Sequence, residues 1–91
     1  MTHVDLILVQ FTLDMENLPA NFPEVLTKER ETVDAWKQSG TIEHLFLRPT
    51  KDGAVILFAH ADVDFVRTLV EQLPLFPFIK SVTYQPVLKQ F

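Results

Sequence analysis

The chain has 91 residues, enough for one domain but not two, and its 47% hydrophobic content is that of a globular rather than a disordered protein. Twelve acidic and eight basic residues give a net charge of −4 without any basic run, which speaks against nucleic-acid binding. Cysteine is absent, which excludes disulfides, thiol chemistry and cysteine-based zinc sites. With neither a signal pattern nor an apolar run of about 20 residues, we expect a cytoplasmic protein without a membrane span.

The first predicted strand covers residues 4–13. Its centre, Leu6-Ile7-Leu8-Val9, is apolar on both alternating faces. This pattern is typical of a strand that is covered on both sides of its sheet.

A long helix is predicted after a short loop. Asn21 is its candidate N-cap, and the helix is expected to begin at Phe22-Pro23 and to end near Ser39. Gly40 follows, a residue that commonly ends helices in the left-handed conformation. The apolar residues of this segment recur with the spacing of one helical face: Phe22, Val25, Leu26, Val33 and Trp36.

Two further strands are predicted over residues 41–48 and 54–59, and the second is again apolar on both faces. The turn between them contains Asp52-Gly53, a hairpin signal.

The remaining elements are a helix over residues 63–73, with Asp62 or Asp64 as its N-cap, and a strand over residues 78–87. The resulting order, β-α-β-β-α-β, predicts an α+β fold of the ferredoxin-like type, an antiparallel sheet with both helices on one face. Helices on one face leave the other face of two doubly apolar strands uncovered. We therefore expect a homodimer whose sheets pack face to face, the dimeric α+β barrel arrangement.

Glu29 falls in the middle of the apolar stripe of the first predicted helix, between Val25 and Val33, at about 100° per residue. Burial disfavours a charged carboxylate and raises its pKa, which suits a general base working near neutral pH. The alternative is that Glu29 lies at the edge of the stripe and pairs with a nearby cation.

The second predicted strand carries a His and an Arg four residues apart. Strict alternation places Ile42, His44, Phe46 and Arg48 on one face. In a cleft, His44 could hold or move a proton and Arg48 could bind a substrate carboxylate. The alternatives are a structural His at a strand edge and a solvated Arg.

The three histidines, His3, His44 and His60, form no HxH, HxxxH or HxxE pattern. We therefore expect no metal site. The sequence also lacks a Ser/His/Asp grouping, a phosphate-binding glycine loop and a dinucleotide fingerprint.

Residues 72–78 read QLPLFPF, an apolar turn with two prolines directly after the second predicted helix. Turns are normally polar, so an apolar turn needs a cover: its own core, a partner subunit or a ligand.

This loop carries the clearest family resemblance. Gln72 to Pro77 followed by an aromatic residue, together with the order of elements over nearly the whole chain, resembles the muconolactone Δ-isomerase family. Weaker matches are His3-Val4, Asp14-Met15, Lys28-Glu29-Arg30-Glu31 and Lys37-Gln38-Ser39-Gly40-Thr41-Ile42-Glu43-His44-Leu45.

The resemblance implies a ferredoxin-like subunit, a dimeric barrel and often a larger ring of dimers. It also implies a proton shift, without cofactor or metal, in an unsaturated lactone from aromatic-ring catabolism. Carried over to this chain, Glu29 would be the base, His44 a donor or second acid–base group and Arg48 the anion holder. Leu75 and Phe76 would form the cleft wall.

Two departures from the family pattern stand on the second strand, where Glu43 and Phe46 occupy positions at which an Arg and a Trp are expected. They imply a less cationic cleft of different shape, with Phe46 contacting the substrate.

Two other functions remain open on this fold. One is a non-catalytic ligand-binding or oligomerisation module, as among YciI-like proteins. The other is a cofactor-free monooxygenase with His44 as base for an activated phenol.

Overall fold

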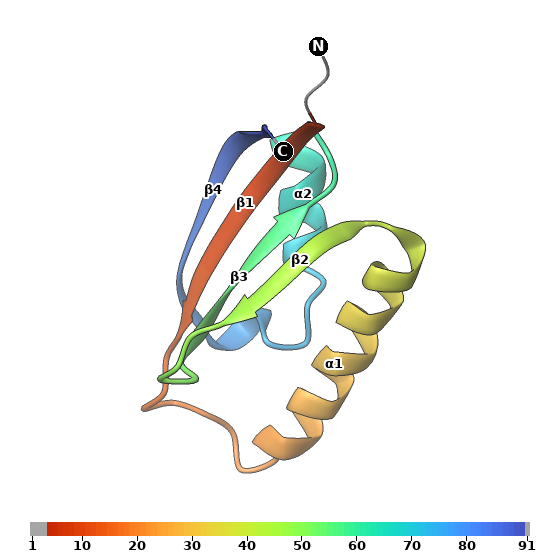
Figure 1. The fold of residues 1–91 in the computed structure, drawn as a ribbon. Coiled ribbons are helices and arrows are strands. Elements are labelled where there is room, and N and C mark those ends of the chain that lie inside the picture. Colours follow the sequence, from red (N-terminus) through yellow and green to blue (C-terminus); the bar gives the residue numbers. More distant parts are fainter. Residues whose placement is uncertain (1–3, 91) are drawn as a thin grey trace.

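The computed structural model describes residues 4–90 (Figure 1). In chain order its elements are β1 (Val4–Leu13), α1 (Phe22–Ser39), β2 (Ile42–Leu47), β3 (Gly53–Phe58), α2 (Val63–Val70), the short 3-10 helix η1 (Phe76–Phe78) and β4 (Ile79–Lys89). The bounds of β1 and α1 are those predicted from the sequence, and those of β2, β3 and β4 differ by one or two residues at each end. No helix within residues 4–90 is both long and apolar enough to cross a membrane.

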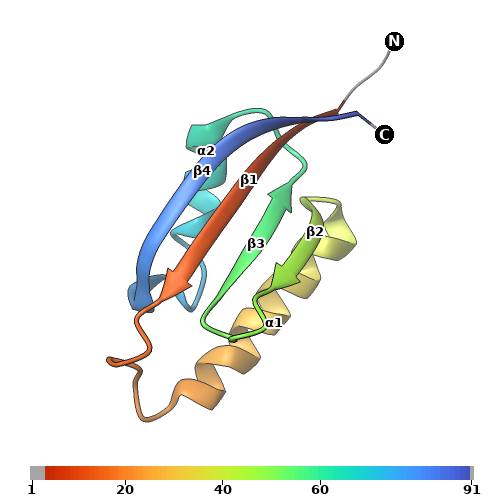
Figure 2. The same cartoon turned by 60° about the vertical axis from the view of Figure 1, so that its left-hand side comes forward.

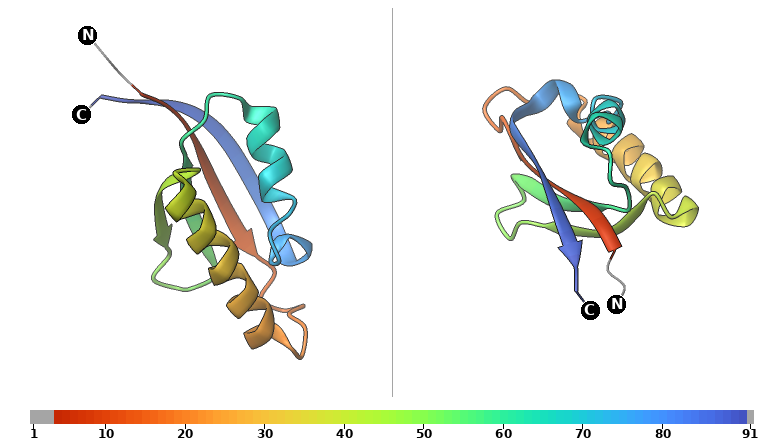
Figure 3. Two further views of the ribbon diagram at one scale, coloured as in Figure 1. Left: turned by 90° about the vertical axis from the view of Figure 1, so that its right-hand side faces the viewer. Right: turned by 90° about the horizontal axis from the view of Figure 1, so that it is seen from above.

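The four strands form one sheet in the order β2-β3-β1-β4, and every neighbouring pair is antiparallel. Figure 2 shows the strands in this order with the helices behind them. Both helices lie on the same side of the sheet (Figure 3). The predicted ferredoxin-like α+β fold is therefore confirmed.

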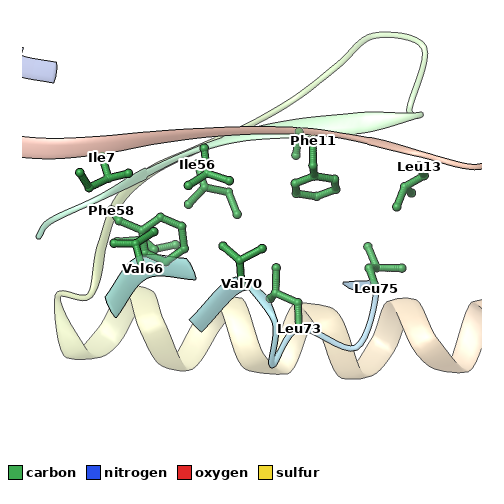
Figure 4. Close-up of a cluster of buried hydrophobic side chains, with 12 residues drawn as sticks. Ile7, Phe11, Leu13, Ile56, Phe58, Val66, Val70, Leu73 and Leu75 are labelled. Atoms are coloured by element: carbon green, nitrogen blue, oxygen red, sulfur yellow. The ribbon is translucent and has the colours of Figure 1, made fainter. Parts of the chain in front are cut away.

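The core lies between the sheet and the helices (Figure 4). Alternate residues of β1 and β3 point from the sheet into it: Ile7, Val9, Phe11 and Leu13, and Ala54, Ile56 and Phe58. From the opposite side it receives Val66, Val70, Leu73 and Leu75. The predicted apolar stripe of α1 packs against this cluster, and the Trp36 ring lies 5.5 Å from that of Phe58.

The two helices begin differently. Asn21 occupies the N-cap position of α1, but its side chain makes no capping hydrogen bond, contrary to our prediction, and only its backbone carbonyl accepts from Glu24 and Val25. At α2 the Asp62 carboxylate accepts hydrogen bonds from the N–H groups of Asp64 and Phe65, so the cap is Asp62 and not Asp64.

Helix α2 ends three residues earlier than predicted. The N–H groups of Gln72 and Leu73 bond to carbonyls three residues back, at Leu69 and Val70, so the chain tightens into turns. Pro74 contributes to this ending, because it has no N–H to donate to the Val70 carbonyl four residues back, which accepts from Leu73 instead.

The predicted alternation along β2 is wrong at its start. A β-bulge between Ile42 and His44 shifts the register, so that Ile42 is buried on the helix side, whereas His44 lies on the other face. Beyond the bulge, Leu45 and Leu47 point to the helix side opposite Ile56 and Ala54.

The turn between β2 and β3 places its unusual backbone at Lys51, which has φ of +62° although it is not glycine. Gly53 is required for another reason. A Cβ at this position would stand 2.2 Å from the backbone oxygen of Phe11 on β1.

A candidate active site between α1 and the sheet

A cleft of about 710 Å³ lies between α1 and the helix-facing side of the sheet. Its walls are largely apolar and come from β1 and the loop after it, α1, β2, β3 and the loop before η1: Phe11, Leu13, Met15, Phe22, Leu26, Val33, Leu45, Leu47, Ala54, Ile56 and Leu75. The volume lies within the range of about 300–1,000 Å³ typical of small-molecule sites.

Glu29 is the buried charged residue of this cleft, with 8% of its surface exposed. Its position on α1, in the middle of the apolar stripe, is the one predicted. The carboxylate oxygen Oε1 accepts a hydrogen bond from the backbone N–H of Leu75, at 3.1 Å. Burial raises the pKa of the Glu29 carboxyl above its ordinary value of 4.5, and the Leu75 hydrogen bond opposes this rise in part.

The raised pKa predicts a pH dependence of stability. Above the ordinary value of 4.5, the folded chain keeps the Glu29 proton more readily than the unfolded chain, so Glu29 lowers the free energy of unfolding as pH rises toward its folded-state pKa. As pH rises through this window, we expect the free energy of unfolding of wild type to fall relative to that of Glu29→Gln. Above the window, the difference between the two proteins should be constant. Urea denaturation of both proteins across the acidic range measures the difference. A difference independent of pH would contradict the raised pKa.

Three further charged residues line the cleft: Arg30 and Asp34 on α1 and Lys51 in the β2–β3 turn. All three are exposed, so they lie at the mouth of the cleft and not in its apolar interior. Among residues 4–90, no ion pair within 4.0 Å involves Arg30 or Lys51. The cleft thus combines one buried carboxyl with cations at its rim.

The apolar loop is covered by its own core. Leu75 is 5% exposed and lines the cleft beside Glu29, as expected for a wall residue. Phe76, also predicted to be wall, packs against the core cluster and does not line the cleft.

His44 and Phe46 do not reach this cleft in the single subunit. Both lie on the face of the sheet opposite the helices, where they pair with Leu57 and Val55 of β3. The two rings stack at 5.8 Å, and His44 Nε2 lies 3.8 Å from the Glu43 carboxylate. The sheet therefore separates His44 from Glu29.

Arg48 is engaged elsewhere as well. Its guanidinium lies 3.8 Å from the Asp52 carboxylate in the same turn, and it does not line the cleft. The cations that do line it, Arg30 and Lys51, were not singled out from the sequence. Nothing in the residue pattern distinguishes Lys51 from any other turn lysine, because the Asp-Gly signal directs attention to Gly53.

Within residues 4–90, no three His, Asp or Glu side chains gather as metal ligands would. His60 lies in the turn before α2, where its Nδ1 accepts a hydrogen bond from the Asp62 N–H. His3 lies outside the described residues.

Comparison with solved structures identifies the fold. A crystal structure of muconolactone isomerase at 3.3 Å resolution is similar with a TM-score of 0.76 and 23% sequence identity, over 90% of this chain and 86% of that one. No family model matches the sequence. No curated protein matches it either. The chain therefore has the α+β fold of muconolactone isomerase, as the resemblance of its sequence to that family implies.

Proposed function

We propose that the protein is a cofactor-free isomerase that shifts a proton, and with it a double bond, in an unsaturated lactone such as the muconolactone of aromatic-ring catabolism. The observation that carries the proposal is Glu29, a carboxyl with raised pKa buried at the wall of an apolar cleft of ligand size. The similarity of fold to muconolactone isomerase supports it.

The proposed reaction requires one group that removes a proton and then returns it. The Glu29 carboxylate takes a proton from a saturated carbon attached to the unsaturated lactone carbonyl system, and the electron pair of the C–H bond delocalises into a dienolate. The carboxylic acid so formed returns the proton to a different carbon of the same system, so that the double bond moves and Glu29 is restored. A raised pKa matches the base to this weak carbon acid, and the cations at the rim of the cleft, Arg30 and Lys51, would attract the negative charge of the dienolate.

Proton NMR of the purified protein with muconolactone in deuterated water tests the proposal. We expect exchange of ring protons with solvent deuterium together with migration of the double bond, both faster than in buffer. A folded protein that causes neither with muconolactone or any lactone offered would refute the isomerase assignment.

A second candidate function is non-catalytic ligand binding, and one contact favours it. The hydrogen bond between Glu29 and the Leu75 N–H joins residues 46 positions apart, so Glu29 could serve to hold the apolar loop against α1. In that case ligands bind to wild type in the cleft without proton exchange, and Glu29→Ala loosens the loop because it removes the acceptor of the Leu75 N–H.

The proposal includes a homodimer formed through the open sheet face, the side without helices. This face presents Leu8, Val55, Leu57 and Phe46 next to Gln10, Thr83 and Gln85. Phe46 is 54% exposed in the single subunit. An apolar strip of this kind on a small domain favours association, since a second copy would cover it.

Leu57→Asp is expected to convert such a dimer to a monomer, because it places a charge at the centre of the open sheet face. Analytical ultracentrifugation measures the mass of both forms. Phe65→Asp is the matched control, since Phe65 is a 44% exposed apolar residue on α2, away from this face. A wild-type protein that stays monomeric at high concentration would exclude the dimer.

A further inference from the structure

The cleft is large and apolar for a small polar lactone. At about 710 Å³ it lies in the upper part of the range of about 300–1,000 Å³ that holds drug-sized ligands. Three of its wall residues remain substantially exposed: Met15 at 47%, Leu45 at 39% and Leu47 at 71%. All three line the same cleft as the buried Glu29, and a small lactone held near Glu29 would leave them exposed to water.

These three exposed residues come from separate segments, the loop after β1 and the strand β2, and they line one cleft. A ligand with an extended apolar body would cover them, and each buried apolar Å² would add to its affinity. The cleft therefore matches a ligand larger than the lactone itself.

Lys51 marks where a charged group of the ligand would lie. Its φ of +62° is unfavourable for a residue with a side chain, and among residues 4–90 it is the one non-glycine residue with positive φ. Asn or Gly would suit this turn better. Lys51 lines the cleft and has no carboxylate within ion-pair distance among residues 4–90. A residue with an unfavourable backbone conformation at such a place is of the kind found at binding sites.

The surrounding charges favour an anion at this mouth. Arg30 lies across the cleft on α1 and, like Lys51, forms no ion pair within the described chain. Asp34 is the one exposed carboxylate that lines the cleft with them. Two cations against one exposed anion complement a carboxylate on the ligand.

We propose that this site takes a bulky, mainly apolar carboxylate, with Lys51 recognising the carboxylate and the strip formed by Met15, Leu45 and Leu47 covering the apolar body. The inference rests on the proposed function in one respect, that both concern the same cleft. Binding of such a ligand does not depend on any chemistry at Glu29. The substrate of the isomerase would then be an unsaturated lactone that bears both a carboxylate and a large apolar substituent.

Binding of simple probes tests the inference without turnover. Isothermal titration calorimetry compares naphthoate, benzoate and the neutral naphthylmethanol on wild type, Lys51→Gly, Lys51→Arg and the control Lys28→Ala. Lys28 is an exposed cation on α1 that does not line the cleft. Lys28→Ala therefore changes the net charge by the same amount as Lys51→Gly but leaves the cleft unchanged.

We expect naphthoate to bind wild type about tenfold more tightly than benzoate, because the second ring buries further apolar surface. Lys51→Gly should weaken naphthoate about fivefold and leave naphthylmethanol unchanged, as for loss of a partly exposed charge contact. Lys51→Arg should restore most of the affinity, and Lys28→Ala should have no effect. Since glycine suits the left-handed backbone, Lys51→Gly should unfold at the same or higher urea concentration than wild type.

Three results would overturn the inference. Equal affinity of wild type for benzoate and naphthoate would remove the argument from size. If Lys51→Gly lowered the affinity for naphthoate and for naphthylmethanol by the same factor, the charge of Lys51 would have no role in recognition. Amide chemical-shift changes confined to the open sheet face, at Leu8 and Leu57, would show that the probes bind elsewhere. If the probes behave as expected and no lactone undergoes proton exchange, the binding inference stands and the isomerase proposal fails.

Discussion

Glu29→Gln is expected to lower the rate of isomerisation at least about a hundredfold, because general-base catalysis typically contributes a factor of about 10²–10⁴. The amide has nearly the shape of the carboxylate but cannot take a proton from carbon. Its side-chain oxygen can still accept the hydrogen bond from the Leu75 N–H that Oε1 accepts in wild type. The variant therefore removes the base while it preserves the contact between α1 and the loop.

Deuterium exchange of the substrate, followed by NMR, measures the effect, and circular dichroism with urea denaturation verifies that the variant is folded. At neutral pH the variant should be no less stable than wild type, because it no longer buries a group whose charged form is disfavoured. Glu31→Gln is the matched control, since Glu31 is exposed on the same helix and does not line the cleft. Full activity of Glu29→Gln would exclude Glu29 as the base.

Gly53→Ala is expected to destabilise the fold by about 3 kcal/mol, the upper part of the usual range for overpacked sites. An added Cβ would stand 2.2 Å from the Phe11 carbonyl oxygen and 3.3 Å from the Phe11 carbonyl carbon, both of them backbone atoms. Backbone atoms cannot rotate away as a flexible side chain can. Relief therefore requires that β3 move away from β1 where the two strands form the inner wall of the cleft.

Gly40→Ala is the comparison that separates collision from backbone strain. Gly40 has φ of +79°, but an added Cβ would meet nothing within 4 Å. Its substitution should cost about 1 kcal/mol, the penalty of a left-handed conformation for a residue with a side chain. Urea denaturation measures both variants. Equal losses for the two would mean that the contact with Phe11 is relieved at no greater cost than the backbone strain at Gly40, and would contradict the expected severe collision.

The positions of the helices and strands could be predicted from the sequence because local signals agreed with the pattern of apolar residues. Gly40 ends α1 as predicted, with its N–H and that of Thr41 bonded to the carbonyls of Lys37 and Trp36. Glu29 could be identified because a charged residue in the middle of an apolar stripe is conspicuous. Its burial confirms its predicted position, and its role as base stays a prediction.

The rest of the site depended on features that leave no local signal. A bulge in β2 separates Ile42 from His44, so strict alternation assigned His44 to the same face as Ile42 when the sheet in fact lies between them. The cations of the cleft come from a helix and from a turn that are brought together only by the packing of α1 on the sheet. Arg48 and Lys51 are three residues apart, and only the shape of the turn determines that Arg48 pairs with Asp52 and Lys51 lines the cleft.

The hydrogen bond between the Leu75 N–H and Glu29 has a further consequence for the timing of a catalytic cycle. If Glu29 carries the proton as proposed, it alternates in each turnover between a carboxylate, a strong acceptor, and a carboxylic acid, a weaker one. The hold on the proline-rich loop would then weaken and recover once per turnover. By reciprocity, whatever orders this loop also lowers the proton affinity of Glu29. A loop without charged residues would thus regulate, through one backbone amide, how readily the cleft accepts a proton.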